Sequence, residues 1–148
     1  MAEKNKKASR TSTLLDRLFN EPDLEKFMER HADEFETPSF HAYITELCKI
    51  TGQVPEQVIR QAAIERTYGH QLFNGTRKPS RDKVIQLSFG FQLTPEDTQK
   101  LLKIAQKSLL YPRIKRDAAI LFCIAHQKDI LETQSVLQNL GMTLLGGE

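Results

Sequence analysis

The chain has 148 residues, of which 39% are hydrophobic, and a formal net charge of +2. This length fits one domain with an appendage, and this hydrophobic share is enough for a core, so we expect a soluble globular protein. The charge is unevenly spread. Residues 1–12 hold four basic and one acidic residue, residues 13–37 three basic and eight acidic, and residues 56–83 six basic and three acidic. The tail and one central segment therefore carry the positive charge.

Cys48 and Cys123 belong to no Cys-x-x-Cys pair, which favours reduced thiols packed in helices and a cytoplasmic protein. No apolar run approaches the roughly 18 residues of a membrane span, and no apolar stretch follows the basic amino terminus. We therefore expect neither secretion nor a membrane partner.

Residues 1–12 predict a basic disordered tail, because they lack the apolar residues that would support a packed structure. Residues 13–36 have apolar residues at helical spacing on both sides of Asn20–Pro22, which predicts two short helices. The tail could add attraction to DNA and the acidic segment could mask a basic surface, although solvated charge is the commoner use of both.

Residues 37–107 predict a five-helix unit. Thr37, Pro38 and Ser39 introduce a first helix that runs up to Gly52. A second helix begins at Pro55, whose φ suits the first helical position, and ends where Ala62 and Ala63 allow a tight turn. A third helix then covers roughly Glu65 to Phe73.

That third helix separates apolar from polar residues. At about 100° per residue, one side holds Ile64, Tyr68, Gly69 and Leu72, and the other holds Arg66, Thr67, His70, Gln71 and Asn74. The loop behind it adds basic residues, namely Arg77, Lys78, Arg81 and Lys83. A polar helix face with almost no acid beside a basic loop suits a polyanion with readable edges.

Two more helices complete the unit. Ser80 is expected to cap the fourth, and Gly90 to help end it. Thr94 followed by Pro95 predicts the start of the fifth.

Residues 113–145 then predict a carboxy-terminal helical pair. Pro112 breaks the preceding pattern, a helix follows to about His126, and Asp129 with Glu132 forms a capping box for the last helix. The pair either packs on the unit or forms a dimer interface. The sequence suggests no β-strand and no internal repeat.

The run Leu72-Phe73-Asn74-Gly75-Thr76-Arg77-Lys78-Pro79-Ser80 resembles the Cro and phage-repressor family, the Xre-like regulators. In that family a helix-turn-helix is followed by an Asn-Gly-basic-Lys-Pro-Ser loop and a further helix. The resemblance covers about Ser39 to Gln106 and implies an all-α, lambda-repressor-like five-helix fold, to which this chain adds helices at both ends.

The resemblance also implies which residues contact DNA. Those facing base edges would be Arg66, Thr67 and Gln71, and those near phosphates Asn74, Arg77 and Lys78. The other candidate DNA-binding residues are His70 on the polar side of the helix, Gly75, whose neighbouring amides would contact the DNA backbone, and Arg81 in the basic loop. The chain departs from the family at several positions. It has Ile59 where the family usually has Ala, Gly69 where it has an aliphatic residue, Phe73 where it has Glu, and Pro55 where Gln often contacts phosphate.

Other chemistries find less support. Cys123 and His126 supply only half of a zinc-ligand pair, and the acids, which we expect on outward faces, form no convergent catalytic set. We therefore expect no metal, no cofactor and no enzyme. Phe73, expected to be rather open, could stack on single-stranded nucleic acid, and the basic run from Arg113 to Arg116 could grip phosphate. Core packing and a solvated helix face are the ordinary uses of such residues.

The sequence thus predicts a bacterial or phage-type transcriptional regulator that binds double-stranded DNA as a homodimer through the carboxy-terminal helices. The alternative is a protein-interaction module on the same fold that no longer binds an operator, with another protein contacting those helices. Pro55, Gly69 and Phe73 would permit it.

Overall fold

The computed structural model describes residues 12–32 and 39–147, and every regular element within these ranges is a helix. The chain divides into two compact units, Met1–Thr37 and Pro38–Glu148. The basic tail up to residue 11 and the expected helix start at Thr37 and Pro38 lie outside the described residues.

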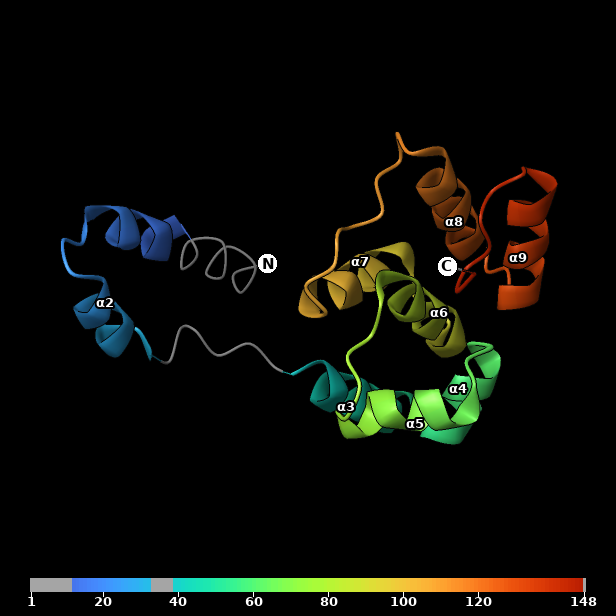
Figure 1. Cartoon of the computed structure of the whole chain (residues 1–148), viewed down its shortest axis with the longest axis horizontal. Helices are drawn as coiled ribbons and strands as arrows, with labels where there is room; N and C mark the ends of the chain where they lie inside the picture. Colours follow the sequence, from blue (N-terminus) through green and yellow to red (C-terminus); the bar gives the residue numbers. More distant parts are fainter. Residues whose placement is uncertain (1–11, 33–38, 148) are drawn as a thin grey trace. The chain divides into compact units, whose positions relative to one another are not determined.

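The first unit contains the two expected short helices, one over residues 12–20 and α2 over Leu24–Arg30 (Figure 1). Asp23 caps α2 by accepting a hydrogen bond from the Lys26 amide at 3.3 Å. Phe27 is 1% exposed, whereas Phe19 is 76% exposed. The unit therefore buries little apolar surface of its own.

The second unit is built from seven helices in its described part. They are α3 Phe40–Thr51, α4 Pro55–Gln61, α5 Arg66–Asn74, α6 Arg81–Phe91, α7 Pro95–Ile104, α8 Lys115–Ala125 and α9 Ile130–Asn139. In Figure 1, α3, α4 and α5 lie on one side of α6, and α7, α8 and α9 surround its other sides. The single hydrophobic core contains side chains from all seven helices.

Local sequence signals set most of the helix starts. Ser80 accepts from the Lys83 amide and Thr94 from the Asp97 amide, both at 3.2 Å, and Asp129 and Glu132 form the expected capping box. Each cap satisfies amides that a first helical turn leaves without partners. The predicted starts of α6, α7 and α9 are therefore confirmed.

Close packing of α4 against α6 explains Gly90. A Cβ at this position would lie 2.5 Å from the Val58 carbonyl oxygen, so only glycine lets the two helices approach this far. The expectation that Gly90 helps end the helix is wrong, because α6 continues to Phe91 and ends at Gln92, whose φ is 58°.

Phe73 also differs from the expectation of an open side chain. It is 8% exposed, and its ring centroid lies 6.4 Å from that of Phe91. Phe73 therefore closes the core between α5 and α6, which removes it as a stacking platform for single-stranded nucleic acid.

The carboxy-terminal half is an internal repeat, so the prediction of no repeat is wrong. Residues 81–111 and 116–146 correspond to one another at an offset of 35 positions: α7 begins at Pro95 and α9 at Ile130, and Gln92 and Gln127 share left-handed φ values of 58° and 57°. Nine aligned pairs are identical: Arg81/Arg116, Asp82/Asp117, Ile85/Ile120, Gln92/Gln127, Thr98/Thr133, Gln99/Gln134, Leu102/Leu137, Leu109/Leu144 and Leu110/Leu145.

Hydrogen bonds repeat with the same offset. The Gln99 side chain exchanges two bonds of 2.8 Å with the backbone of Leu110, and Gln134 exchanges bonds of 2.9 and 2.8 Å with that of Leu145. Each glutamine thus ties the segment that ends a repeat back to the second helix of that repeat.

The two repeats are joined by a reciprocal exchange of charged side chains. Arg81 donates to both oxygens of Asp117, at 3.1 and 2.9 Å, and Arg116 donates to both oxygens of Asp82, at 3.1 and 3.0 Å. Each repeat contributes one arginine and one aspartate, and each arginine pairs with the aspartate of the other repeat. The contact is therefore reciprocal, as in an interface with two-fold symmetry.

Further bonds complete both sites. Arg81 also donates to the Ser108 and Leu109 carbonyls, as Arg116 does to those of Thr143 and Leu144. The Tyr111 and Gly146 amides donate to Asp117 and Asp82, both at 2.9 Å.

Asp82 and Asp117 are each 2% exposed, which corrects the expectation that the acids lie on outward faces. Burial acts to raise the pKa of both carboxyls. The paired guanidinium and the backbone amide outweigh it and hold each pKa below its ordinary value. Both aspartates are therefore ionised partners of a buried ion pair at neutral pH.

Candidate nucleic-acid interface

The tight pair formed by α4 and α5 depends on a complementary choice of residues. A Cβ on Gly69 would lie 2.5–2.8 Å from the side-chain carbons of Ile59, so the Ile59 side chain fills the space that glycine leaves open. Ala63 forms the turn with φ 55°. The large side chain of Ile59 therefore requires glycine at position 69, and together these two residues let α4 and α5 pack closely.

The amino-terminal end of α5 points polar groups outward. Glu65 caps the helix, accepting from the Thr67 and Tyr68 amides at 2.9 and 2.8 Å, and these bonds lower the pKa of its carboxyl. Thr67 is exposed, and the Arg66 side chain is 77% exposed. The first turn of α5 can therefore reach a partner in solution.

Glu56 of α4 holds two basic side chains of this face. Its carboxylate accepts from Arg66 Nε at 2.8 Å and contacts Nε2 of His70. The His70 hydrogen bond is the largest cause, and the Arg66 bond the second, of a lowered Glu56 pKa. Because both partners are solvent-accessible, the Arg66 pair contributes little to stability, and the guanidinium can exchange it for a ligand.

Gln71 and Tyr68 fix the first basic residue of the loop. Arg77 donates from Nε to Gln71 Oε1 at 2.9 Å, and its guanidinium carbon lies 4.5 Å from the centroid of the Tyr68 ring. Lys83 Nζ lies 5.3 Å from the same ring. Two cations therefore gather over one aromatic side chain beside the outward face of α5.

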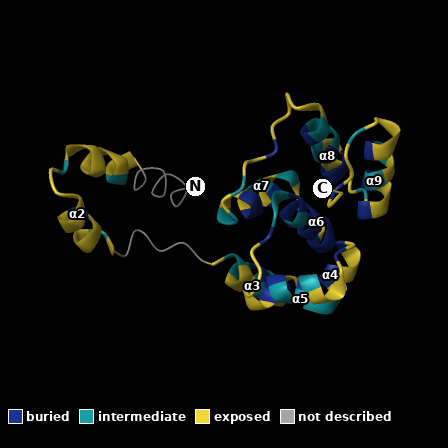
Figure 2. Cartoon of the chain, viewed as in Figure 1, coloured by how far each residue is buried: buried dark blue, intermediate teal, exposed yellow. Residues whose placement is uncertain are grey.

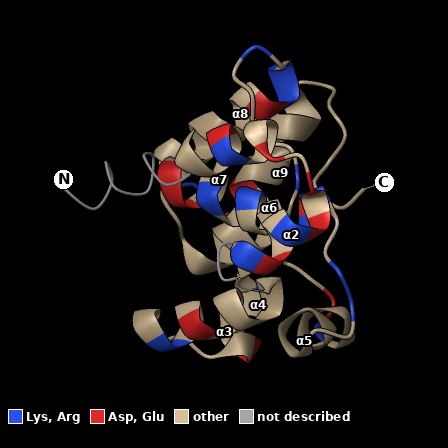
Figure 3. Cartoon of the chain, turned by 90° about the vertical axis from the view of Figure 1, so that its left-hand side faces the viewer, with Lys and Arg blue, Asp and Glu red and all other residues tan. Residues whose placement is uncertain are grey.

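The loop itself is held by Asn74 and Gly75. Asn74 Oδ1 accepts from the Thr76 amide and hydroxyl at 2.9 and 2.7 Å. Gly75 has φ 83°, and a Cβ there would lie 2.7–3.0 Å from the His41 ring, so the turn requires glycine. Lys78 follows, exposed, in the stretch shown in Figure 3 between α5 and α6.

Arg81 has a different position from the other predicted site residues. Its guanidinium donates hydrogen bonds to Asp117 and to two carbonyl groups, and its side chain is 24% exposed. Sequence reasoning grouped it with the loop because it follows Lys78 closely. Its structural partner lies 36 residues away, and no local signal indicates that pairing.

Eight of the nine predicted residues lie on α5 or in the loop directly after it, and we call them the α5 face: Arg66, Thr67, His70, Gln71, Asn74, Gly75, Arg77 and Lys78. Sequence reasoning missed Glu56, Tyr68 and Lys83 as members of its hydrogen-bond and cation–π network. Their proximity depends on how α4 and α6 pack on α5.

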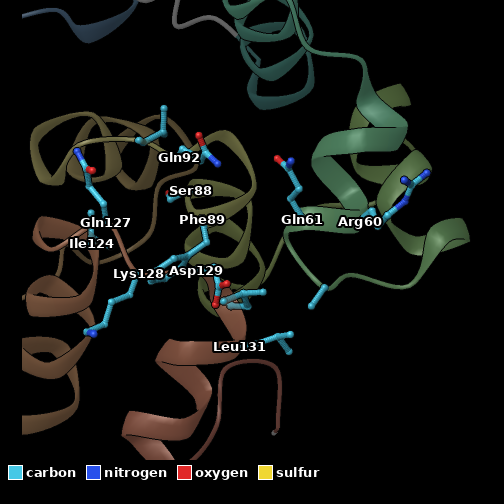
Figure 4. A pocket seen from close by; sticks show the side chains of 13 residues that line it. Arg60, Gln61, Ser88, Phe89, Gln92, Ile124, Gln127, Lys128, Asp129 and Leu131 are labelled. Atoms are coloured by element: carbon cyan, nitrogen blue, oxygen red, sulfur yellow. The ribbon is translucent and has the colours of Figure 1, made fainter.

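A separate hollow of about 660 Å³ lies between the ends of α4 and α6 and the turn from α8 to α9 (Figure 4). Two of its charged lining residues have partners: Lys128 lies 3.9 Å from Glu132, and Asp129 caps α9. Arg60 lies on the opposite wall. The hollow contains no converging acid and base.

Both cysteines are buried free thiols, and burial raises the pKa of Cys48. His126 stacks on Phe122 at 3.9 Å. Among residues 12–32 and 39–147, no three acidic, histidine or cysteine side chains are grouped to hold a metal ion. Within the same ranges, no helix has the length and apolar character required to cross a bilayer.

Comparison with protein-family models, with curated proteins and with solved structures finds no match to this chain.

Proposed function

We propose that this protein binds double-stranded DNA through the α5 face, as a lambda-repressor-like helix-turn-helix regulator. The observation that carries the proposal is the Arg77 guanidinium, fixed by Gln71 and Tyr68 beside an exposed Arg66 and Thr67 at the start of α5. A cation held in place next to an outward helix end suits phosphate, while the helix end itself suits base edges.

The residues then divide by role. Arg66 can donate two hydrogen bonds to guanine after exchanging its contact with Glu56, and Gln71 can do the same to adenine when Arg77 turns to a phosphate. Arg77, Lys78 and the amides around Gly75 set the register on the backbone. A homodimer through the carboxy-terminal helices would present two such faces to paired half-sites about one helical turn apart.

A second candidate function is a protein-interaction module, and Glu56 favours it. Its carboxylate lies on the same face as Arg66 and His70 and offsets the charge of Arg66. A face with balanced charge binds a polyanion less strongly than the basic residues alone suggest. DNA binding at low salt separates the two functions.

The experiment is a binding-site selection from random duplexes with the wild type, Arg66→Ala and Arg77→Ala. Arg66→Ala should cost about 1–3 kcal/mol on the best site and relax preference at one base pair. Arg77→Ala should weaken all sequences about equally and reduce the salt slope by about 1.

Arg60→Ala is the matched control, because Arg60 is an exposed arginine of α4 on the wall of the separate hollow. If Arg66→Ala selects the same motif with the same stringency as Arg60→Ala, Arg66 does not read bases.

A further inference from the structure

Comparison of the two repeats shows that one face of α8 lacks the covering helix that the equivalent face of α6 has. On α6, Gln86 donates to the Ala62 carbonyl at 3.2 Å and Gly90 packs on Val58, so α4 covers both positions. Leu87, between them, is 0% exposed. Their equivalents 35 positions later are apolar and more exposed. Leu121 is half-buried, Phe122 is 51% exposed, and Ala125 is exposed.

The difference is visible in Figure 2, where α6 is almost wholly in the buried colour and α8 is not. The helix α4 covers this face in the first repeat, and within the second unit none of the helices α3 to α9 takes the equivalent place in the second repeat. The surface that we call the α8 face consists of the half-buried Ala118 and Leu121 and the exposed Phe122 and Ala125. Apolar surface gathered in this way on a helix marks a contact site.

The exposed ring of Phe122 is held in one orientation by its neighbour His126. Its ring stacks on His126 with centroids 3.9 Å apart, and His126 is itself held by a 2.8 Å contact between Nδ1 and the Phe122 carbonyl oxygen. A half-exposed aromatic ring held in one orientation loses little freedom when a partner covers it. Such residues are the usual anchors of protein interfaces.

We propose that the α8 face binds the α8 face of a second copy of this chain, with the two helices antiparallel about a two-fold axis. Ala118, Phe122 and Ala125 follow one another at spacings of four and three, so they form one stripe with a large residue between two small ones. Crossed on itself, the stripe places each ring against the small residues of the other copy, which is the self-complementarity that a two-fold interface requires.

Charge favours the same orientation. Lys115 is exposed at the amino-terminal end of α8, and no acidic side chain belongs to the stripe. In an antiparallel pair each Lys115 approaches the carboxy-terminal end of the other helix, where the partial negative charge of the helix dipole attracts it. A parallel pair would bring the two lysines together.

This inference deepens the dimer that forms part of the proposed function, and its test uses no DNA. Dimerisation can therefore fail while DNA binding survives, and DNA binding can fail in a protein that still dimerises.

The test is the mass of the full chain in solution, by sedimentation equilibrium over a micromolar to submillimolar concentration series. The wild type should approach twice the monomer mass. Phe122→Glu should remain monomeric throughout, because it places a charge in the centre of the contact. Ile50→Glu is the matched control, since Ile50 is a 73% exposed aliphatic residue of α3 and the variant should dimerise as the wild type does.

Ala125→Glu provides a second probe in case Phe122→Glu unfolds, and thermal melting checks that each variant is folded. A monomeric wild type at the highest concentration would overturn the proposal, as would an undiminished dimer in a folded Phe122→Glu or Ala125→Glu variant. If the α8 face binds a different protein, the wild type should remain monomeric at the highest concentration.

Orientation is tested by oxidation of cysteine variants. An equal mixture of Ala118→Cys and Ala125→Cys should form disulfide-linked dimers more readily than either variant alone. Cross-linking of each variant with itself and not with the other would contradict the antiparallel arrangement.

Discussion

In the first repeat, over residues 81–111, α6 is surrounded on all sides, whereas in the second, over residues 116–146, α8 uses the same hydrogen-bond plan and leaves Phe122 half exposed. The polar bonds that define the backbone are kept in both, from the Arg–Asp exchange to the paired glutamines. The side chains that meet other elements have changed. The same helical unit can therefore support the α4–α5 pair in its first copy and, in its second copy, present a surface to another protein chain.

The largest expected effect comes from breaking the exchange that both repeats share. Arg81→Met or Arg116→Met leaves a buried carboxylate without its guanidinium, so each should cost about 3–5 kcal/mol of unfolding free energy. The two losses should be similar because the two sites have the same partners. Urea denaturation measures them, with Arg113→Met as control, since Arg113 is exposed in the adjoining segment.

A loss below about 0.5 kcal/mol for Arg81→Met would place it among ordinary surface changes. Arg81 would then be open again to a role in ligand binding.

A smaller effect distinguishes the repeats at one aligned position. Gly90→Ala should cost about 1–3 kcal/mol, because the added Cβ meets the Val58 carbonyl oxygen. Helix propensity alone would make the same change favourable by about 1 kcal/mol. The equivalent residue Ala125 is exposed in the monomer and is the last residue of α8, so in dilute, monomeric protein Ala125→Gly should follow propensity and cost at most about 1 kcal/mol.

Thermal or urea unfolding measures both variants. Stabilisation by Gly90→Ala would show that α4 and α6 do not pack as closely as the structure has them.

The smallest expected effect is the dependence of stability on acid pH, which does not appear at neutral pH. Since the folded pKa values of Asp82 and Asp117 are depressed, their contribution to stability is complete above the ordinary aspartate pKa of about 3.9. It is lost as the pH falls through the folded values. Unfolding curves recorded below about pH 4 should show this loss, and it should be smaller in Asp82→Asn/Asp117→Asn. An equal acid slope in that double variant would assign the loss to other carboxyls.

The sequence predicts the helices well because their signals are local. Thr94 with Pro95 and Asp129 with Glu132 mark helix starts without reference to the rest of the chain. The repeat is different, since only nine of its 31 aligned positions are identical and its equivalences depend on backbone geometry such as the left-handed Gln92 and Gln127.

The candidate site divides in the same way. The outward positions of α5 follow from helical spacing, and the Asn74–Gly75 turn from its residues. The separation of Arg77 from Arg81 does not, because only the fold brings Asp117 to the second of these two arginines. Glu56 is likewise linked to the site only by the packing of α4 on α5.

The most direct test of the proposed function is a titration of purified protein against random duplex DNA at two salt concentrations. Binding should be readily detected at low salt and should weaken as salt rises, with a slope of about −0.9 in log affinity against log salt for each phosphate contacted. Arg77→Ala should reduce that slope by about 1, whereas Arg60→Ala should leave it unchanged. No binding at low salt, or affinity that does not change with salt, would contradict DNA binding through the α5 face and leave the protein-interaction module as the function of this fold.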